Sequence, residues 1–279
     1  MEKLQVTMLA SGSKGNAALI NSGSQLFLVD LGISCRSLTA KMTSLGYSPK
    51  DLSGVFITHE HRDHIKGLGT FVKKYQVPLY TSRATWQAIV ATSSLPVTKN
   101  CYVLDQGLRL GDVVIKAFAI PHDAVDPHGY IFQRDQEKLT YVTDTGFVSP
   151  LVREAVTGAT TLVLEANHDV KMLKEGSYPP HLKRRILSTK GHLSNDGAAM
   201  LLSALPRLPE KVVLAHLSEE NNLPSLAHRT VEEILTEQHR LQETELFVAS
   251  QVNIVSTVAE EDNSQEAAAA AKIENIPLF

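Results

Sequence analysis

Cysteine is scarce in this sequence, and its scarcity excludes two kinds of small-protein architecture. Only Cys35 and Cys101 occur among the 279 residues, and they do not form a CxxC pair. A disulfide framework needs several cysteines and a zinc ribbon needs paired ones, so neither is indicated. With 43% hydrophobic residues, the chain has enough apolar surface for a sizeable core, and two isolated cysteines suit a reducing compartment.

Long hydrophobic runs are also missing. The first ten residues alternate between polar and apolar side chains and lack the apolar segment of a signal peptide. No later stretch stays apolar for the roughly 20 residues that a membrane span requires. We therefore expect a soluble, cytoplasmic protein without a membrane partner.

An excess of one charge is absent from most of the chain. The formal charge of −3 originates in residues 259–279, which carry five acids and one lysine, whereas residues 1–258 carry 26 bases and 25 acids. This balance neither requires nor excludes a polyanionic partner, so the placement of charges has to decide. The segment 259–279 is acidic, then alanine-rich, and has no apolar periodicity. We expect it to be a disordered tail outside a domain of residues 1–258.

Short β-rich runs alternate with amphipathic helical stretches along the chain. Strands are predicted at 5–9, 17–21, 25–30, 54–58, 78–81, 101–104, 113–119, 130–134, 139–143, 162–165, 211–215 and 246–249. Helices are predicted at 34–46, 65–75, 85–91, 149–155, 181–187, 196–205 and 225–240. No period of about 20–50 residues indicates a solenoid or propeller. A layered sandwich with outer helices is the predicted architecture.

The strongest chemical signal is the segment 58–64, which reads Thr-His-Glu-His-Arg-Asp-His and follows a predicted buried strand. Residues two apart in an extended loop point the same way, so His59 and His61 can share one metal ion. Asp63 and His64 can reach a second ion where the chain bends into a helix. Nitrogen and carboxylate ligands favour zinc, manganese or iron over calcium or magnesium. The alternative, a solvated histidine-rich loop, is disfavoured by further candidate ligands downstream.

Three of those ligands stand at the ends of predicted strands. His122 follows Pro121, Asp144 lies in a Val-Thr-Asp-Thr-Gly segment, and His216 closes a Val-Val-Leu-Ala strand. Taken alone, His122 could equally be a surface histidine and Asp144 a turn or helix-capping residue. Together with the first four they supply seven ligands, enough for two ions with open positions for water and substrate.

These motifs, in this order, resemble the metallo-β-lactamase superfamily, in which HxHxDH is followed by single His, Asp and His motifs. The likeness covers about residues 1–255. The segments 10–16, 58–64, 167–169, 191–195 and 215–218 are similar to the YycJ/WalJ branch, which is related to ribonuclease Z and comprises bacterial metal-dependent nucleases described as DNA exonucleases. The resemblance implies the fold class α/β (α+β), an αββα sandwich of two mixed β-sheets with outer helices.

The resemblance also implies how the site is divided. It assigns the ligands to two divalent metal ions: His59, His61 and His122 to one, Asp63, His64 and His216 to the other, with Asp144 bridging them. Two cations about 3.5–4 Å apart would yield a bridging hydroxide for in-line attack on phosphorus. Asp63 is accordingly also counted as a catalytic residue.

His192 is similar in context to the non-metal histidine of ribonuclease Z, which pairs with an acidic residue near the scissile phosphate. Glu165 is the candidate partner, and both are predicted to be catalytic. His192 would protonate the leaving alkoxide or stabilise charge on the phosphoryl oxygens. Its alternative role is a residue at a helix entry, before the capping residue. His168 is expected either to line the site and orient ligands, or simply to pack in a loop.

A glycine-rich loop is a candidate for phosphate contact. Ser11, Ser13 and Asn16 belong to the segment 11–16, which could present backbone N–H groups to a phosphate. It is not a Walker A motif, because no Gly-Lys-Ser/Thr follows at the required spacing. Ordinary turn chemistry between two strands remains the alternative.

Residues 171–190 form the most basic stretch, with six cations against one acid. Within it, Lys183, Arg184 and Arg185 are predicted to contact the phosphate backbone of a nucleic-acid substrate. A solvated helix face is the alternative interpretation.

The sequence thus predicts a dinuclear-metal-dependent phosphodiesterase, a DNA exonuclease by resemblance, with nucleic acid as its substrate. A thioester or amide hydrolase of the glyoxalase II or lactamase type is the alternative, because the same fold and metals serve it. The segment 191–195 favours phosphodiesters. A non-enzymatic metal-binding scaffold is disfavoured, because open coordination positions serve no structural purpose. Metal identity, DNA against RNA, exo- against endonucleolytic cleavage and oligomeric state are left open.

Overall fold

The computed structural model describes residues 3–92, 100–104 and 107–258. The tail at 259–279, expected to be disordered, lies outside the described residues, and the domain boundary at residue 258 stays a prediction. None of the helices in the described ranges has the length and apolar character that crossing a membrane requires.

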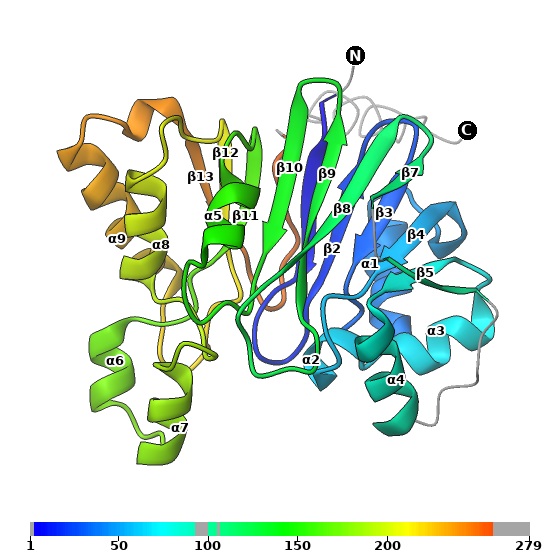
Figure 1. Ribbon diagram of the computed structural model, residues 1–279, viewed down its shortest axis with the longest axis horizontal. Helices are drawn as coiled ribbons and strands as arrows, with labels where there is room; N and C mark the ends of the chain where they lie inside the picture. Colours follow the sequence, from blue (N-terminus) through cyan, green and yellow to red (C-terminus); the bar gives the residue numbers. More distant parts are fainter. Residues whose placement is uncertain (1–2, 93–99, 105–106, 259–279) are drawn as a thin grey trace, which may run out of the picture.

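Two β-sheets lie face to face at the centre of the molecule (Figure 1). Within the described residues, the first sheet contains, in spatial order, β14 (Val255–Ser256), β1 (Gln5–Ala10), β2 (Ala17–Asn21), β3 (Leu26–Val29), β4 (Leu52–Phe56), β5 (Leu79–Thr81) and β6 (Cys101–Val103). The second contains β13 (Glu245–Val248), β12 (Lys211–Ala215), β11 (Thr161–Glu165), β10 (Glu137–Val142), β9 (His128–Arg134), β8 (Val113–Ala119) and β7 (Leu108–Leu110). Each sheet is antiparallel over part of its width and parallel over the rest.

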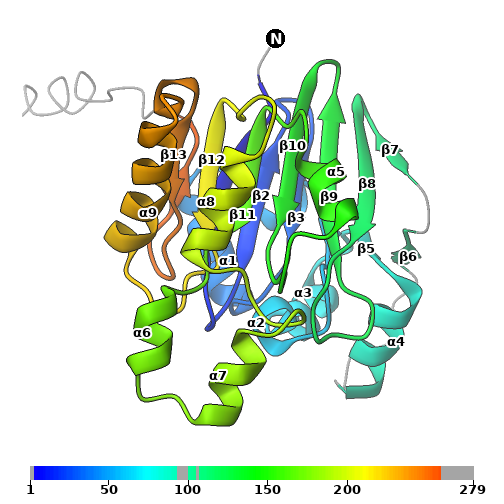
Figure 2. The same ribbon diagram turned by 60° about the vertical axis from the view of Figure 1, so that its left-hand side comes forward.

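Helices cover the outer face of each sheet, which completes four layers (Figures 1 and 2). The first sheet is covered by α1 (Cys35–Ser44), α3 (Leu68–Lys74) and α4 (Arg83–Thr92), whose apolar residues share one core cluster with its strands. The second is covered by α5 (Pro150–Val156), α8 (Asn195–Ser203) and α9 (Pro224–Glu237) in the same way. The predicted α/β sandwich of two mixed sheets with outer helices is confirmed.

The parallel strands are nearly continuous apolar runs because both of their faces are buried. In β11, Leu162 and Leu164 pack toward the helices, while Val163 between them joins the core between the two sheets. In β12, Val212 and Val213 divide between the same two cores. This alternation follows from the two-residue repeat of a strand.

The helix predicted at 65–75 is instead two helices, α2 (Arg62–Ile65) and α3. Gly67 lies at the break, where a Cβ atom would stand 2.0 Å from Leu31 Cδ2 and 2.2 Å from the Ile33 carbonyl oxygen. The chain therefore approaches the segment after β3 more closely than any other residue would allow.

One end of the sandwich gathers the polar residues. The segments that follow β4, β8, β10 and β12 meet there, as expected where parallel strands end at the same edge. The short helices α6 (Val170–Glu175) and α7 (Pro180–Ile186) extend beyond the sheets at this end in both views (Figures 1 and 2). The connection from β11 to β12, which contains α6 and α7, therefore lies next to the predicted ligand cluster.

Candidate metal centre and active site

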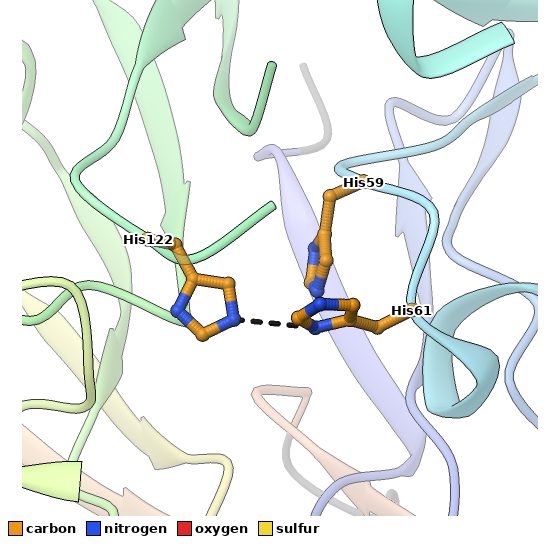
Figure 3. A group of neighbouring side chains, drawn as sticks. All are labelled: His59, His61 and His122. Carbon is orange, nitrogen blue, oxygen red and sulfur yellow. Dashed lines mark hydrogen bonds between the residues drawn. The ribbon is translucent and has the colours of Figure 1, made fainter. Parts of the chain in front are cut away.

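Three histidines from two distant segments face one another at this end (Figure 3). His59 and His61 come from the segment after β4, and His122 comes from the loop after β8. Each offers a ring nitrogen, and these nitrogens lie within 4.8 Å of one another. The nearest approach shown is between His122 Nε2 and His61 Nδ1, at 3.3 Å. The three rings are thus spaced to share one ion.

A second trio lies beside the first. Oδ2 of Asp63 is 3.4 Å from His64 Nε2 and 3.5 Å from His216 Nε2. The carboxylate of Asp144 reaches both trios: its Oδ2 is 3.4 Å from His64 Nε2, and its Oδ1 is 3.7 Å from His122 Nε2. All seven predicted ligands are therefore brought together, with Asp144 between the two groups.

Three buried polar atoms of this cluster lack a hydrogen-bond partner in the protein and are suited to bind a metal ion. Among the described residues, His59 Nε2, Asp144 Oδ2 and His216 Nε2 have no hydrogen-bond partner. Buried polar atoms in native proteins are nearly always hydrogen-bonded, so each needs another partner. Imidazole nitrogen and carboxylate oxygen are ligands of zinc and of other transition metals. The residues present thus fit divalent metal ions.

Backbone strain accumulates at the same place. Asp144 and His216 have φ angles of 57° and 58°, in the left-handed region that residues with a Cβ atom rarely occupy. Asp30 at the end of β3 has a φ of 60° and is fully buried. Strain of this kind persists at functional sites when the surrounding structure holds it in place.

Asp30 orients His64, and the sequence analysis did not identify it. Its Oδ2 lies 2.8 Å from His64 Nδ1, while its Oδ1 accepts from the Thr58 backbone N–H at 2.9 Å. Burial raises the pKa of Asp30, and the neighbouring His64 opposes that rise. With Nδ1 bonded to a carboxylate, His64 presents Nε2 to the metal cluster. The only signal in the sequence was an acidic residue directly after four apolar ones.

The other buried histidines among the predicted ligands are oriented in the same way. His122 Nδ1 lies 3.1 Å from the Gly191 carbonyl oxygen, and His216 Nδ1 lies 2.9 Å from Glu165 Oε1. His59 Nδ1 lies 3.0 Å from the Thr58 hydroxyl. Because Nδ1 is occupied in each ring, Nε2 is the nitrogen left to bind a metal.

His192 and Glu165 are paired, as the sequence analysis suggested. His192 Nδ1 lies 2.8 Å from Glu165 Oε1, and the same oxygen contacts His216 Nδ1. Glu165 Oε2 accepts from two backbone N–H groups, those of Thr145 at 2.8 Å and Leu193 at 3.0 Å. Burial alone would raise the pKa of Glu165, but His192 and His216 hold it well below its usual range. Glu165 is thus a buried carboxylate shared by His192 and a predicted ligand.

The carboxylates raise the pKa values of two buried histidines, His64 and His216. Burial alone would lower the pKa of His216, but Asp144, Asp63 and Glu165 raise it to about 10. The pKa of Asp63 is held far below its usual range by His64 and His216, against the effect of burial. The cluster therefore carries negative charge that either protons or metal ions can neutralise.

The cluster opens into a cavity of about 220 Å³. Asp63, Asp144 and His192 line it, and so do Tyr178 and Arg185 from the α7 region. Arg185 is paired with Asp123, because its Nε lies 2.5 Å from Asp123 Oδ2. Tyr178 and Asp123 were not singled out from the sequence. Arg185 was predicted to contact the substrate, but its pairing with Asp123 was not predicted.

The glycine-rich loop has a different role from the predicted one. Ser11 is buried and its Oγ accepts from the backbone N–H of His216 at 2.7 Å. Asn16 is also buried: its Oδ1 accepts from Gly12 N at 2.8 Å, and its backbone N–H donates to the Asp63 carbonyl oxygen at 2.8 Å. These bonds tie the loop to the segments that carry Asp63 and His216. Ser11 and Asn16 therefore hold the ligand segments in place, and the groups named here are not free to contact a phosphate. Ser13 lines the cavity.

The basic residues of α7 also separate into two kinds. Lys183 donates to the carbonyl oxygens of Lys174 and Gly176, both at 2.7 Å, so its ammonium is engaged within the α6–α7 connection. Arg184 is exposed, and Arg185 lines the cavity. The prediction of a phosphate contact is therefore disfavoured for Lys183 by its geometry, and stays open for the two arginines.

His168 lies inside the protein and does not line the cavity. It is 1% exposed, and neither ring nitrogen has a hydrogen-bond partner among the described residues. Burial lowers its pKa to about 4. Its carbonyl oxygen accepts from the Asn195 backbone N–H at 3.0 Å, which fixes the start of α8. A direct substrate contact is therefore not possible in this arrangement, and the loop-packing alternative describes His168 better.

Comparison with known proteins agrees with this geometry. Residues 26–217 match the model of the beta-lactamase superfamily domain. The chain is 40% identical over 230 residues to exodeoxyribonuclease WalJ of Streptococcus pneumoniae serotype 2 (strain D39 / NCTC 7466), covering 81% of this chain and 86% of that protein. It is 38% identical over 238 residues to exodeoxyribonuclease YycJ of Bacillus anthracis, covering 84% and 90%.

A solved structure shows the same fold at low sequence identity. The metallo-beta-lactamase fold protein YhfI of Bacillus subtilis is 18% identical and superposes with a TM-score of 0.67 over 91% of this chain and 100% of that one. The family model covers well over half of the chain, and the two exodeoxyribonucleases exceed 30% identity over most of it. The chain therefore belongs to the beta-lactamase superfamily, in the metal-dependent hydrolase family of these exodeoxyribonucleases.

Proposed function

We propose that the protein is a two-metal phosphodiesterase that acts on nucleic acid, as an exonuclease that removes nucleotides from the ends of DNA. The observation that carries the proposal is the Glu165–His192 pair, because His192 lines the same cavity as five of the seven candidate ligands. The metal ions would serve a thioester or amide hydrolase equally well. An additional oriented histidine suits a reaction in which an alkoxide departs and takes up a proton. The exodeoxyribonucleases to which the chain is similar support the choice of DNA.

Two divalent cations would be held by the seven predicted ligands, with zinc, manganese or iron suited to the donor set. His59, His61 and His122 would hold one, Asp63, His64 and His216 the other, and Asp144 would contact both. When bound, the cations supply charge that activates water and stabilises negative charge on the phosphate. Asp30 and Glu165 keep the ligand rings oriented for this purpose.

His192 is proposed as the general acid. Its Nδ1 is bonded to Glu165, so the proton it can give to a departing oxygen is on Nε2. The buried carboxylate of Glu165 fixes the plane of the His192 ring. Asp63, which borders the cavity and pairs with two histidines, is proposed to help position the attacking water as well as to bind metal.

The proposal is tested with purified protein loaded separately with zinc, manganese or iron and analysed for metal content. The substrates are end-labelled linear DNA, end-labelled RNA, closed circular DNA, bis(p-nitrophenyl) phosphate and S-lactoylglutathione. We expect metal-dependent release of mononucleotides from linear DNA and no cleavage of the circle. Faster turnover of S-lactoylglutathione than of either phosphodiester, without nuclease activity, would establish the thioester hydrolase instead.

The compartment is also part of the proposal. Both cysteines, Cys35 and Cys101, are free, and burial raises the pKa of the Cys101 thiol to about 12. A protein with two unpaired cysteines suits the reducing cytoplasm, where chromosomal DNA is available as a substrate.

A further inference from the structure

A second cavity adjoins the metal centre beside α2. It measures about 330 Å³ and is lined by Ser13, Lys14, Arg62, Asp63 and Lys66. Ser13 and Asp63 also line the cavity of the metal centre, so the two spaces are contiguous. Three of the five lining residues are lysine or arginine, whereas Arg185 alone is of this kind in the lining of the metal cavity.

The walls of this second cavity are rigidly joined. The Asn16 backbone N–H donates to the Asp63 carbonyl oxygen at 2.8 Å, which fixes the glycine-rich loop against α2. A Cβ atom on Gly32 would stand 1.6 Å from that same carbonyl oxygen, so the segment after β3 is packed directly behind it. The loop that carries Lys14 is therefore bonded directly to the segment that carries Arg62 and Asp63.

Arg62 and Lys66 lie on the same face of the chain, four residues apart, where the Lys66 backbone N–H donates to the Arg62 carbonyl oxygen at 2.9 Å. Both side chains are exposed. Lys14 is paired with Glu219, at 2.5 Å, but neither Arg62 nor Lys66 has an acidic partner within 4.0 Å in the part of the chain that the structure describes. Two unpaired cations therefore face the solvent beside the reaction site.

We infer that this second cavity binds the phosphate backbone of the substrate strand next to the scissile phosphate, with Arg62 and Lys66 as its main contacts. The inference rests on the proposed function and extends it, since the sequence predicted phosphate contacts on α7 and in the loop 11–16 but none on α2. A strand whose scissile phosphate lies at the metal centre passes over Ser13, the residue shared by both cavities. Its next phosphates then meet the cations of α2.

The test removes the two unpaired charges. The Arg62→Gln/Lys66→Gln variant and the parent, both loaded with metal, are titrated with a hydrolysis-resistant phosphorothioate single strand of about 12 nucleotides, and binding is measured by fluorescence anisotropy from low to high salt. Each phosphate neutralised on a single strand contributes about −0.7 to the slope of log K against log salt. We expect the slope to flatten by about 1.4 and binding at 0.1 M salt to weaken at least about tenfold.

A matched control removes the same charge elsewhere. Lys50→Gln/Lys73→Gln takes away two exposed lysines that line neither cavity, and its salt slope should equal that of the parent. An unchanged slope in the Arg62/Lys66 variant, or an equal flattening in the control, overturns the inference while leaving the proposed function intact. A parent protein that neither binds the strand nor hydrolyses DNA overturns the proposed function, and the inference with it.

Discussion

Asp144 is the residue that joins the two halves of the metal cluster, because its carboxylate lies 3.4 Å from His64 and 3.7 Å from His122. We predict that Asp144→Ala lowers the rate of phosphodiester hydrolysis by at least about 1,000-fold and reduces bound metal, as Asp63→Ala should also do. The far-ultraviolet circular dichroism spectrum should stay that of the parent, since the ligand loops lie outside the three apolar cores. The exposed Glu154→Ala is the control. Parental rate and metal content in either ligand variant would refute the assignment.

His192 and Glu165 should behave differently on substitution, although they touch each other. His192→Ala is predicted to keep its metal and to lose about 100-fold or more in rate, because only a proton donor is removed. Glu165→Gln should lose rate and also about 10- to 100-fold in metal affinity, because the same carboxylate orients His216. Metal analysis and steady-state rates on bis(p-nitrophenyl) phosphate distinguish the two. Loss of metal from His192→Ala would instead make that histidine a ligand.

The raised pKa of His216 makes metal binding dependent on pH. In the metal-free protein its folded pKa of about 10 lies above the ordinary value of 6.5. The bound proton thus stabilises the metal-free fold fully below pH 6.5, and this stabilisation is lost as pH rises through about 10. A metal ion must displace that proton, so we predict that metal affinity increases with pH across this interval.

Isothermal titration calorimetry in two buffers of different ionisation enthalpy measures the protons released on metal binding. The parent should release at least one proton at pH 7.5, and His216→Ala should release fewer. A metal affinity that is flat from pH 6.5 to 9 would contradict the prediction.

The ligands were predictable at the residue scale, whereas their supports were not. HxHxDH places four ligand side chains within six residues of sequence. The other three follow apolar strands, where a polar residue can be recognised as a functional candidate because it does not belong to the core. Asp30 gave no comparable signal, because one acidic residue after an apolar strand also suits an ordinary turn. Ser11 was predicted only as a phosphate contact, and its bond to the His216 backbone, 205 positions away in the chain, left no signal in the sequence.

At the scale of elements, the three cationic residues of α7 have different contacts. Lys183 bonds two carbonyl oxygens of the α6–α7 connection, whereas Arg184 is exposed and Arg185 lines the cavity and pairs with Asp123. We predict that Arg184→Gln/Arg185→Gln flattens the salt slope of duplex DNA binding by up to about 1.8, at about 0.9 per phosphate contact. Lys183→Gln should leave the slope unchanged and raise amide hydrogen-exchange rates in residues 174–187. A flattened slope for Lys183→Gln would restore the original assignment of all three residues.

The elements that the sequence predicted well are those with strong apolar periodicity. Strands β11 and β12 and helix α9 appear where they were expected. Helix α6 was missed because its six residues bury only Leu173, and its start depends on the Asp169 side chain, which accepts from the Met172 backbone N–H. The break between α2 and α3 was missed because it depends on Gly67 packing against Leu31, a contact between segments distant in sequence. Periodicity cannot report such contacts.

At the scale of the whole molecule, the metal centre joins the two sheets. His59, His61, Asp63 and His64 follow a strand of the first sheet, whereas His122, Asp144 and His216 follow strands of the second. Strand order and the facing of the two sheets could be predicted only through resemblance, because pairing between distant strands leaves no local pattern. The cavities depend on that facing, so their linings emerged only with the structure.

A site built from both sheets should couple metal binding to global stability. Metal that binds only the folded chain stabilises it by about 2.7 kcal/mol when free metal is 100 times the dissociation constant. For a domain of this size, that corresponds to a rise in Tm of about 5–10 °C. We predict a fall of this size when the protein is treated with a chelator and scanned by differential scanning calorimetry. Asp144→Ala, which loses the residue between the two trios, should show a much smaller fall. An unchanged Tm in parent protein whose metal has demonstrably been removed would mean that the two sheets hold together without the ions, and that the ligands act in catalysis alone.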